Sequence, residues 1–178
     1  MNRTHIAALG YVYVALGVTG LGLLDGGDDA RRAAAALFSL AAAAFLWFLG
    51  SLRSRLMRYD PDGFFAAIVL VGGASSVAVQ VVAVALVARS GPDDVLSFLS
   101  ALGAPSAATV VIASSAAALR ARKVSKAFGR AGLLGGLAIL GVGFTEAADK
   151  WTLTDSYSAS WLGFMIWVAV TATYLLRR

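Results

Sequence analysis

The stretch Arg120-Ala-Arg-Lys-Val-Ser-Lys-Ala-Phe-Gly-Arg130 decides how this chain is arranged. It carries five positive charges and no negative charge, and it lies between two long apolar stretches. Lysine and arginine accumulate in the cytoplasmic loops of membrane proteins. The stretch therefore marks the cytoplasmic side of a bilayer if its apolar neighbours are membrane spans.

The composition is that of a membrane protein. Apolar residues make up 59% of the 178 residues and charged residues only 14%, whereas a soluble domain has about 25% charged residues. The mean hydropathy is +0.77. A membrane-crossing helix needs about 20 apolar residues, so several spans fit and a separate soluble domain does not. We predict a single transmembrane domain over residues 1–178.

Six apolar segments are long enough to cross a bilayer. They are separated by short stretches rich in charge and in turn-forming residues, of which residues 60–63 (Asp-Pro-Asp-Gly) have the strongest turn chemistry. The predicted spans cover residues 4–24, 33–52, 64–88, 95–119, 131–148 and 157–176. The expected fold class is all-α, a polytopic bundle of six transmembrane helices.

The distribution of charge predicts the orientation of this bundle. Eleven of the 15 basic residues fall at the two termini and in the second and fourth loops. Only Asp60 and Asp62 among the ten acidic residues share that side. The positive-inside rule then places both termini in the cytoplasm. We expect the basic side to meet anionic lipid headgroups and expect no nucleic-acid partner. The predicted headgroup contacts are Arg120, Arg122, Lys123, Lys126 and Arg130.

Small residues predict which face of each span looks into the bundle, because membrane helices approach one another closely through glycine, alanine and serine. Three spans carry such residues at steps of three and four. The stripes are Gly132, Gly136, Ile139, Gly143 and Glu146; Gly72, Ser76, Gln80 and Ala83; and Gly10, Tyr13, Gly17 and Gly20. We expect these three faces to be interior.

Polar side chains within the spans predict a pocket. Gln80 and Glu146 lie at similar depth, roughly 6 to 9 Å outside the membrane midplane at about 1.5 Å per residue. Ser106 and Thr109 lie nearer the midplane, beside Pro105. A polar group in lipid must be hydrogen-bonded or reach water. One interpretation is a ligand-binding pocket, open to the outside, with Gln80, Glu146, Ser106 and Thr109 in its wall. The alternative is that these groups only join helices or bond to their own helix.

Five aromatic residues allow further expectations. Four of them lie near the ends of spans and are predicted to form the belts that aromatic side chains make at membrane interfaces: Trp47, Trp151, Trp161 and Tyr174. Trp167 lies near the middle of the last span. It is compatible with a place in the core or with a lipid-facing position.

Signatures of catalysis and of metal binding are missing from the sequence. The chain has no cysteine and a single histidine, His5, and it has no nucleophile elbow and no Walker loop. We therefore expect a non-enzymatic protein without a cofactor or metal, acting as a small binding or accessory subunit. Its expected partners are membrane lipids and either another protein or a second copy. A small-solute transporter or channel component and a membrane-embedded lipid-modifying enzyme stay open as alternatives.

The alanine-rich spans with arginine-rich ends resemble a group of known proteins. The stretch Phe48-Leu-Gly-Ser-Leu-Arg-Ser-Arg-Leu-Met-Arg58 and residues 167–178 look like those of small multi-pass membrane proteins of high-GC actinobacteria. The resemblance implies a bacterial cytoplasmic membrane and transfers no catalytic residue. Six helices in a short chain also resemble in topology the substrate-binding subunits of energy-coupling-factor vitamin transporters. Those subunits dock through an Ala-x-x-x-Ala face of the first helix, where this chain has Gly10 and Gly17.

Overall fold

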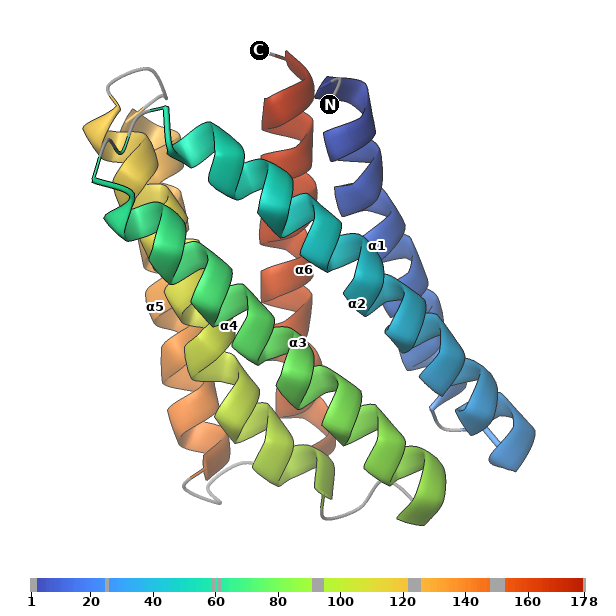
Figure 1. Cartoon of the computed structure of the whole chain (residues 1–178). Coiled ribbons are helices and arrows are strands. Elements are labelled where there is room, and N and C mark those ends of the chain that lie inside the picture. The colour runs from blue at the N-terminus through green and yellow to red at the C-terminus, as the bar shows by residue number, and fades with distance from the viewer. Residues whose placement is uncertain are drawn as a thin grey trace.

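The computed structural model describes residues 3–24, 26–58, 60, 62–90, 95–121, 126–147 and 153–177. Within these residues the chain is all-α and forms six helices (Figure 1). They are α1 (Arg3–Leu23), α2 (Asp28–Leu56), α3 (Phe64–Ser90), α4 (Val95–Arg120), α5 (Lys126–Ala147) and α6 (Leu153–Arg177). The prediction of six helical segments is confirmed.

Three helices extend beyond their predicted apolar segments. α2 begins at Asp28 rather than at residue 33 and ends at Leu56 rather than at residue 52. α5 begins at Lys126 rather than at residue 131, and α6 begins at Leu153 rather than at residue 157. Apolarity marks the part of a helix inside hydrocarbon, whereas backbone hydrogen bonding continues into the headgroup region. In α2 the added turns carry acidic residues at the start and arginines at the end, which complement the helix dipole.

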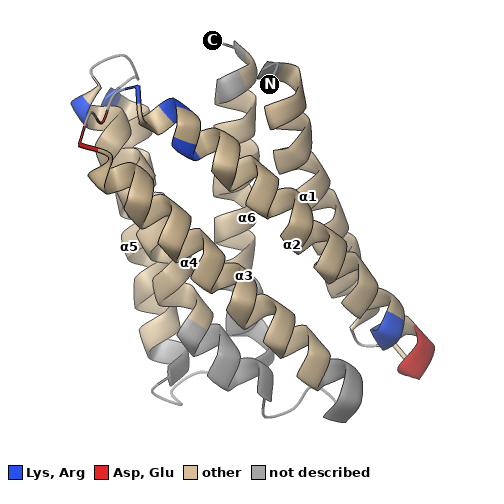
Figure 2. Cartoon of the chain, in the orientation of Figure 1, with Lys and Arg blue, Asp and Glu red and all other residues tan. Residues whose placement is uncertain are grey.

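The helices have the length and composition of membrane spans. Among the described residues, α1, α2, α3 and α5 each contain a segment long and apolar enough to cross a bilayer. Figure 2 shows the described charges gathered at the two ends of the bundle, with uncharged helix between them. The chain is therefore a multi-pass helical membrane protein. That α4 and α6 also cross the membrane stays a prediction.

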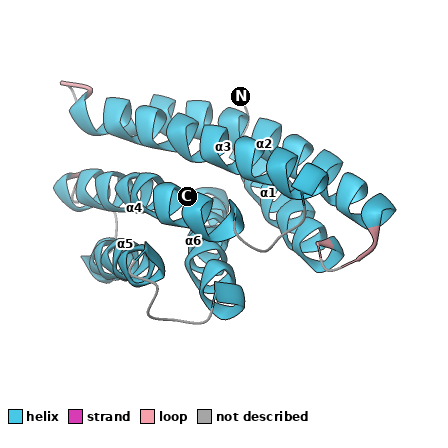
Figure 3. Cartoon of the chain, turned by 90° about the horizontal axis from the view of Figure 1, so that it is seen from below, coloured by secondary structure: helices cyan, strands magenta, loops and turns pink. Residues whose placement is uncertain are grey.

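The six helices form a ring. Each helix packs on its neighbours in the chain, and α6 closes the ring by packing on α1 while also contacting α4. Seen from below, α2 and α3 lie on one side and α5 and α6 on the other (Figure 3). The hydroxyls of Tyr11 and Thr173, 2.8 Å apart, join α1 to α6. The start of α1 and the end of α6 lie at the same end of the bundle (Figure 1).

A central aromatic cluster packs α1, α2 and α6 against one another. It consists of Tyr13, Phe45, Phe48, Phe164 and Trp167, all buried. The ring centroids of Tyr13 and Phe45 are 4.7 Å apart, and those of Phe45 and Phe164 are 5.4 Å apart. Aromatic pairs at such separations add to the energy of simple packing. The cluster connects α1, α2 and α6. Of the two positions open to Trp167, the core is therefore the one that it occupies.

The predicted small-residue faces are interior wherever the structure describes them. A Cβ atom added to Gly136 would lie 2.5 Å from Cγ1 of Ile112 and 3.3 Å from the Ala108 carbonyl oxygen. Gly143 similarly faces Ala104, and the buried glycines of α1 and α3 also approach neighbouring helices. The helices can pack this closely only because the side chains there are minimal. The side chain of Glu146 lies outside the described part of the chain.

The prediction that Trp161 belongs to an interfacial belt is wrong. Trp161 is buried, with its ring centroid 5.1 Å from that of Phe38. Gly17 on α1 contributes to this, because an added Cβ there would press on Met165 and lie 3.3 Å from the edge of the Trp161 indole. Without a side chain at that position, α1 leaves room for the ring inside the bundle. Trp47, in contrast, is 67% exposed, and Tyr174 is half-buried and stacks on Phe128. Trp151 lies outside the described residues.

The turn between α2 and α3 forms as its sequence predicts. The Gly63 N–H donates to the Asp60 carbonyl at 2.9 Å, and Gly63 has a φ of 68°, a conformation that glycine adopts without strain. The buried Asp60 carboxylate accepts from the backbone N–H groups of Phe65 at 2.6 Å and Ala66 at 3.1 Å. It thereby caps the start of α3.

Candidate functional site

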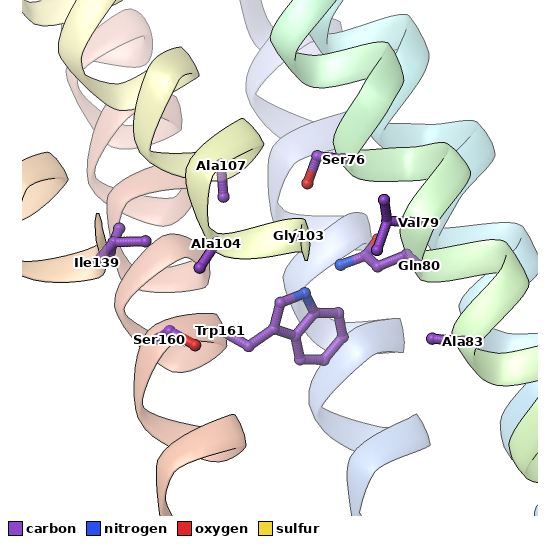
Figure 4. A pocket seen from close by; sticks show the side chains of 10 residues that line it. All are labelled: Ser76, Val79, Gln80, Ala83, Gly103, Ala104, Ala107, Ile139, Ser160 and Trp161. Carbon is purple, nitrogen blue, oxygen red and sulfur yellow. The ribbon is translucent and has the colours of Figure 1, made fainter. Parts of the chain in front are cut away.

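A small cavity lies between four helices in the half of the bundle away from the start of α1 and the end of α6. It has a volume of about 30 Å³ and is partly open. Because a water molecule needs about 10–15 Å³ on this measure, the cavity holds about two waters or the end of a small molecule. Its lining residues are Ser76, Val79, Gln80 and Ala83 of α3, Gly103, Ala104 and Ala107 of α4, Ile139 of α5, and Ser160 and Trp161 of α6 (Figure 4).

Gln80 is the most polar residue of the cavity lining, and a hydrogen bond to α1 holds its side chain in place. Its Nε2 donates to the hydroxyl of Tyr13 at 3.2 Å, and Tyr13 is itself fixed in the central aromatic cluster. The half-buried amide projects from α3 toward the indole of Trp161 on α6 (Figure 4). A hydrogen bond to a rigid partner reduces the rotamer freedom of a long side chain, so the amide is preorganised at the cavity.

Two hydroxyl groups complete the polar part of the lining. Ser76 lies one turn before Gln80 on α3, and its hydroxyl points into the cavity (Figure 4). Ser160 precedes Trp161 on α6, and both serines are buried. None of the described residues that line the cavity is ionisable. The site can donate and accept hydrogen bonds, but these side chains offer no general acid or base.

Ser106 and Thr109 lie at a different place from Gln80. They line an outer groove between α3 and α4 that also includes Pro105 and Gly72. The hydroxyl of Thr109 donates to the carbonyl of Pro105 at 2.7 Å, within its own helix. The face of α4 that lines the cavity consists of Gly103, Ala104 and Ala107. Ser106 and Thr109 lie at about the same depth as the cavity, but their side chains belong to a different face of α4. That Ser106 and Thr109 bind a ligand stays a prediction, and it concerns this outer groove rather than the cavity at Gln80.

The remaining predicted residues divide by whether the structure describes them. Arg122 and Lys123 lie outside the described residues, as does the side chain of Glu146. The part of α5 that reaches the cavity is Ile139, two turns before Glu146 on the predicted stripe. At the other end of the bundle Lys126 and Arg130 are exposed, and the guanidinium of Arg120 lies 4.8 Å from the ring centroid of Phe65.

Sequence reasoning missed Ser160 and Trp161 as parts of the site. The pairing of α6 with the stripe of α3 across the ring depends on which helices become neighbours, and no feature of the last span indicates that. A partial signal exists in Gly17, because Met165 and Trp161 of α6 both pack where this residue has no side chain. Within the part of the chain that is described, no three acidic or histidine side chains gather to hold a metal ion.

Comparison of the chain with protein-family models, with curated proteins and with solved structures finds no significant match.

Proposed function

We propose that this protein is a non-enzymatic binding or accessory subunit of a bacterial cytoplasmic membrane, with the cavity at Gln80 as its ligand site. The observation that carries the proposal is the gathering of the Gln80 amide, two serine hydroxyls and the Trp161 indole in one space inside a membrane-spanning bundle. Polar groups at such depth are costly unless they have partners. A protein partner or a second copy would complete the accessory role.

The chemistry of the lining favours an uncharged ligand. The described lining residues offer hydrogen bonds and apolar surface, but no charge to balance that of an ion. The volume of about 30 Å³ admits a single polar group, such as a carbonyl or hydroxyl, rather than a whole metabolite. The best candidate is a small, largely apolar molecule that places its one polar end at Gln80. The same small volume and neutral lining favour binding over solute transport and over lipid chemistry.

The proposed orientation puts the cavity on the outer side of the membrane and the termini in the cytoplasm. Cysteines at positions 29 and 58, at opposite ends of α2, provide the test in this cysteine-free chain. In intact cells a membrane-impermeant maleimide should label Asp29→Cys and leave Arg58→Cys unlabelled until the cells are permeabilised. The reverse labelling pattern would mean that the termini and the arginine-rich end of α2 lie outside the cell.

Access to the cavity is tested by a cysteine at Gln80. If the cavity takes up water or a ligand, Gln80→Cys should react with a small methanethiosulfonate reagent applied from outside, because these reagents attack the thiolate that forms in water. Ala78→Cys is the matched control, since Ala78 lies at nearly the same depth but faces outward from α3. It should react at least about tenfold more slowly, because its thiol would sit in lipid.

Ligand occupancy is then read from the same site. Mass spectrometry of gently solubilised protein should find a neutral molecule with the wild type and a reduced amount with Gln80→Leu, which keeps the volume and removes the hydrogen bonds. Equal reactivity of the two cysteines, or the same bound molecules in wild type and Gln80→Leu, would reject the cavity as a ligand site. Gln80 would then have a structural role only, joining α3 to Tyr13 of α1.

A further inference from the structure

A second concave site lies at the end of the bundle where α1 begins and α2 ends. It is a groove of about 490 Å³, and we call it the α1–α2 groove. Its lining consists of Ile6 from α1 together with Leu46, Trp47, Gly50, Ser51, Ser54, Arg55 and Arg58 from α2 and the turn after it. It shares no residue with the cavity at Gln80.

The groove follows one face of α2. Trp47, Gly50 and Ser54 are separated by three and four residues, so they lie one above another along the helix. Arg58 follows in the turn after the end of α2. An added Cβ at Gly50 would touch nothing within 4 Å. This glycine therefore leaves a notch in the middle of the face. The hydroxyls of Ser51 and Ser54 donate to carbonyls of their own helix, at 3.0 and 2.9 Å, and line the notch without projecting far from it.

The groove changes from apolar to basic along its length. Leu46 and Trp47 are exposed at the lower end, Trp47 by 67% of its surface. Arg55 and Arg58 lie at the upper end, and Arg58 is exposed and forms no ion pair with another described residue. Tryptophan at the hydrocarbon boundary with arginines beyond it matches the order of acyl chain, glycerol and phosphate in a phospholipid.

The length of α2 places this gradient at the correct level of a bilayer. Its 29 residues extend about 44 Å at 1.5 Å per residue. The hydrocarbon core is about 30 Å thick and the bilayer with headgroups about 40–45 Å. The last turns of α2 therefore stand in the headgroup layer, and Trp47 lies two turns below Arg55, near the boundary.

We propose that the α1–α2 groove binds one anionic phospholipid. Arg55 and Arg58 hold its phosphate, the glycerol region lies over the notch at Gly50, and one acyl chain packs on Leu46 and Trp47. Charge complementarity selects the anionic headgroup, and the apolar lower half selects a lipid over a soluble phosphate. This site is separate from the basic stretch at residues 120–130, where headgroup contact is expected from charge alone.

Native mass spectrometry of the delipidated full chain in detergent tests the charge. With equal concentrations of phosphatidylglycerol and phosphatidylcholine, the protein should retain one phosphatidylglycerol preferentially. Arg58→Gln should lower that retention on the order of fivefold, the effect of one basic residue near an anionic surface. Arg53→Gln is the matched control, because it removes the same charge from the same helix end but does not line the groove. Its effect should stay within about twofold.

The shape of the groove is tested without changing charge. Gly50→Leu fills the notch and should reduce retention of phosphatidylglycerol about as much as Arg58→Gln does. Gly22→Leu on α1 is its control, since an added Cβ there also meets nothing within 4 Å, and it should leave retention unchanged. Circular dichroism checks that the variants stay helical.

Three results would overturn the proposal. Equal retention of the two lipids would show that the headgroup charge is not recognised. Equal losses with Arg53→Gln and Arg58→Gln would show a diffuse surface effect and no site. Displacement of the lipid by glycerol phosphate at the same concentration would assign the arginines to a soluble phosphate compound instead. Conversely, failure of glycerol phosphate to compete supports a lipid as the occupant.

Discussion

Phe45→Ala is expected to lower the free energy of unfolding of the bundle by about 3 kcal/mol. Phe45 is 1% exposed and contacts Tyr13, Phe48 and Phe164 in the central aromatic cluster. Three helices meet around it, so truncation opens a cavity that no single helix can close. In a membrane the apolar side chain gains little from leaving lipid, and the loss is mainly one of packing and dispersion contacts.

Phe144→Ala separates this packing loss from the general effect of removing an aromatic ring. Phe144 is 64% exposed on α5, and lipid chains can fill the space that it leaves. Equilibrium unfolding in mixed micelles of detergent and sodium dodecyl sulfate should show about 0.5 kcal/mol or less for this variant. Similar losses for Phe45→Ala and Phe144→Ala would mean that the cluster does not hold the ring of helices together.

Gly136→Leu is expected to destabilise the bundle by about 3 kcal/mol, at the upper end of the usual cost of overpacking. The first atom of the new side chain would press on Cγ1 of Ile112 at 2.5 Å. Ile112 could rotate away, but the backbone atoms of Ala108 and Ile112, both 3.3 Å from that position, cannot. The only relief is separation of α4 from α5, which undoes the packing of the whole pair.

Gly135→Leu is a control in the same helix, one residue away. An added Cβ at Gly135 meets nothing within 4 Å. Both variants make the same change in helix propensity, so the difference between them measures only the contact with α4. Thermal unfolding in detergent, followed by circular dichroism, should place Gly136→Leu well below wild type and Gly135→Leu close to it. Equal unfolding midpoints for the two variants would show that the small-residue stripe of α5 does not determine its packing on α4.

The sequence predicts the number and order of the helices because hydropathy reports directly on the length of each span. It predicts the ends of α3 and α4 to within two residues, since turn-forming residues and charges coincide there. It underestimates α2 at both ends, because Arg31 is already helical before the apolar residues begin, and Arg53 and Arg55 continue the helix after they end. Charge marks the edge of the hydrocarbon, whereas a helix ends where its backbone bonding stops.

The sequence predicts only those parts of the candidate site that depend on which face of a single helix points inward. The stripe of α3 correctly brings Ser76 and Gln80 to the interior. The direction of Ser106 depends on how α4 is rotated about its axis, which its alanine-rich sequence does not specify. Trp161 depends on which helix lies opposite α3, and this is a property of the whole ring. Depth in the membrane follows from residue number, but proximity across the bundle does not.

The closing of the ring by α6 also determines when the protein can finish folding during synthesis. Tyr11 and Thr173 are bonded across 162 residues of chain, and Phe164 of α6 packs against Tyr13 and Phe45 of the first two helices. Contacts between such distant parts of a chain form slowly. The packing of the first two helices therefore stays incomplete until α6, the last helix to be synthesised, is present.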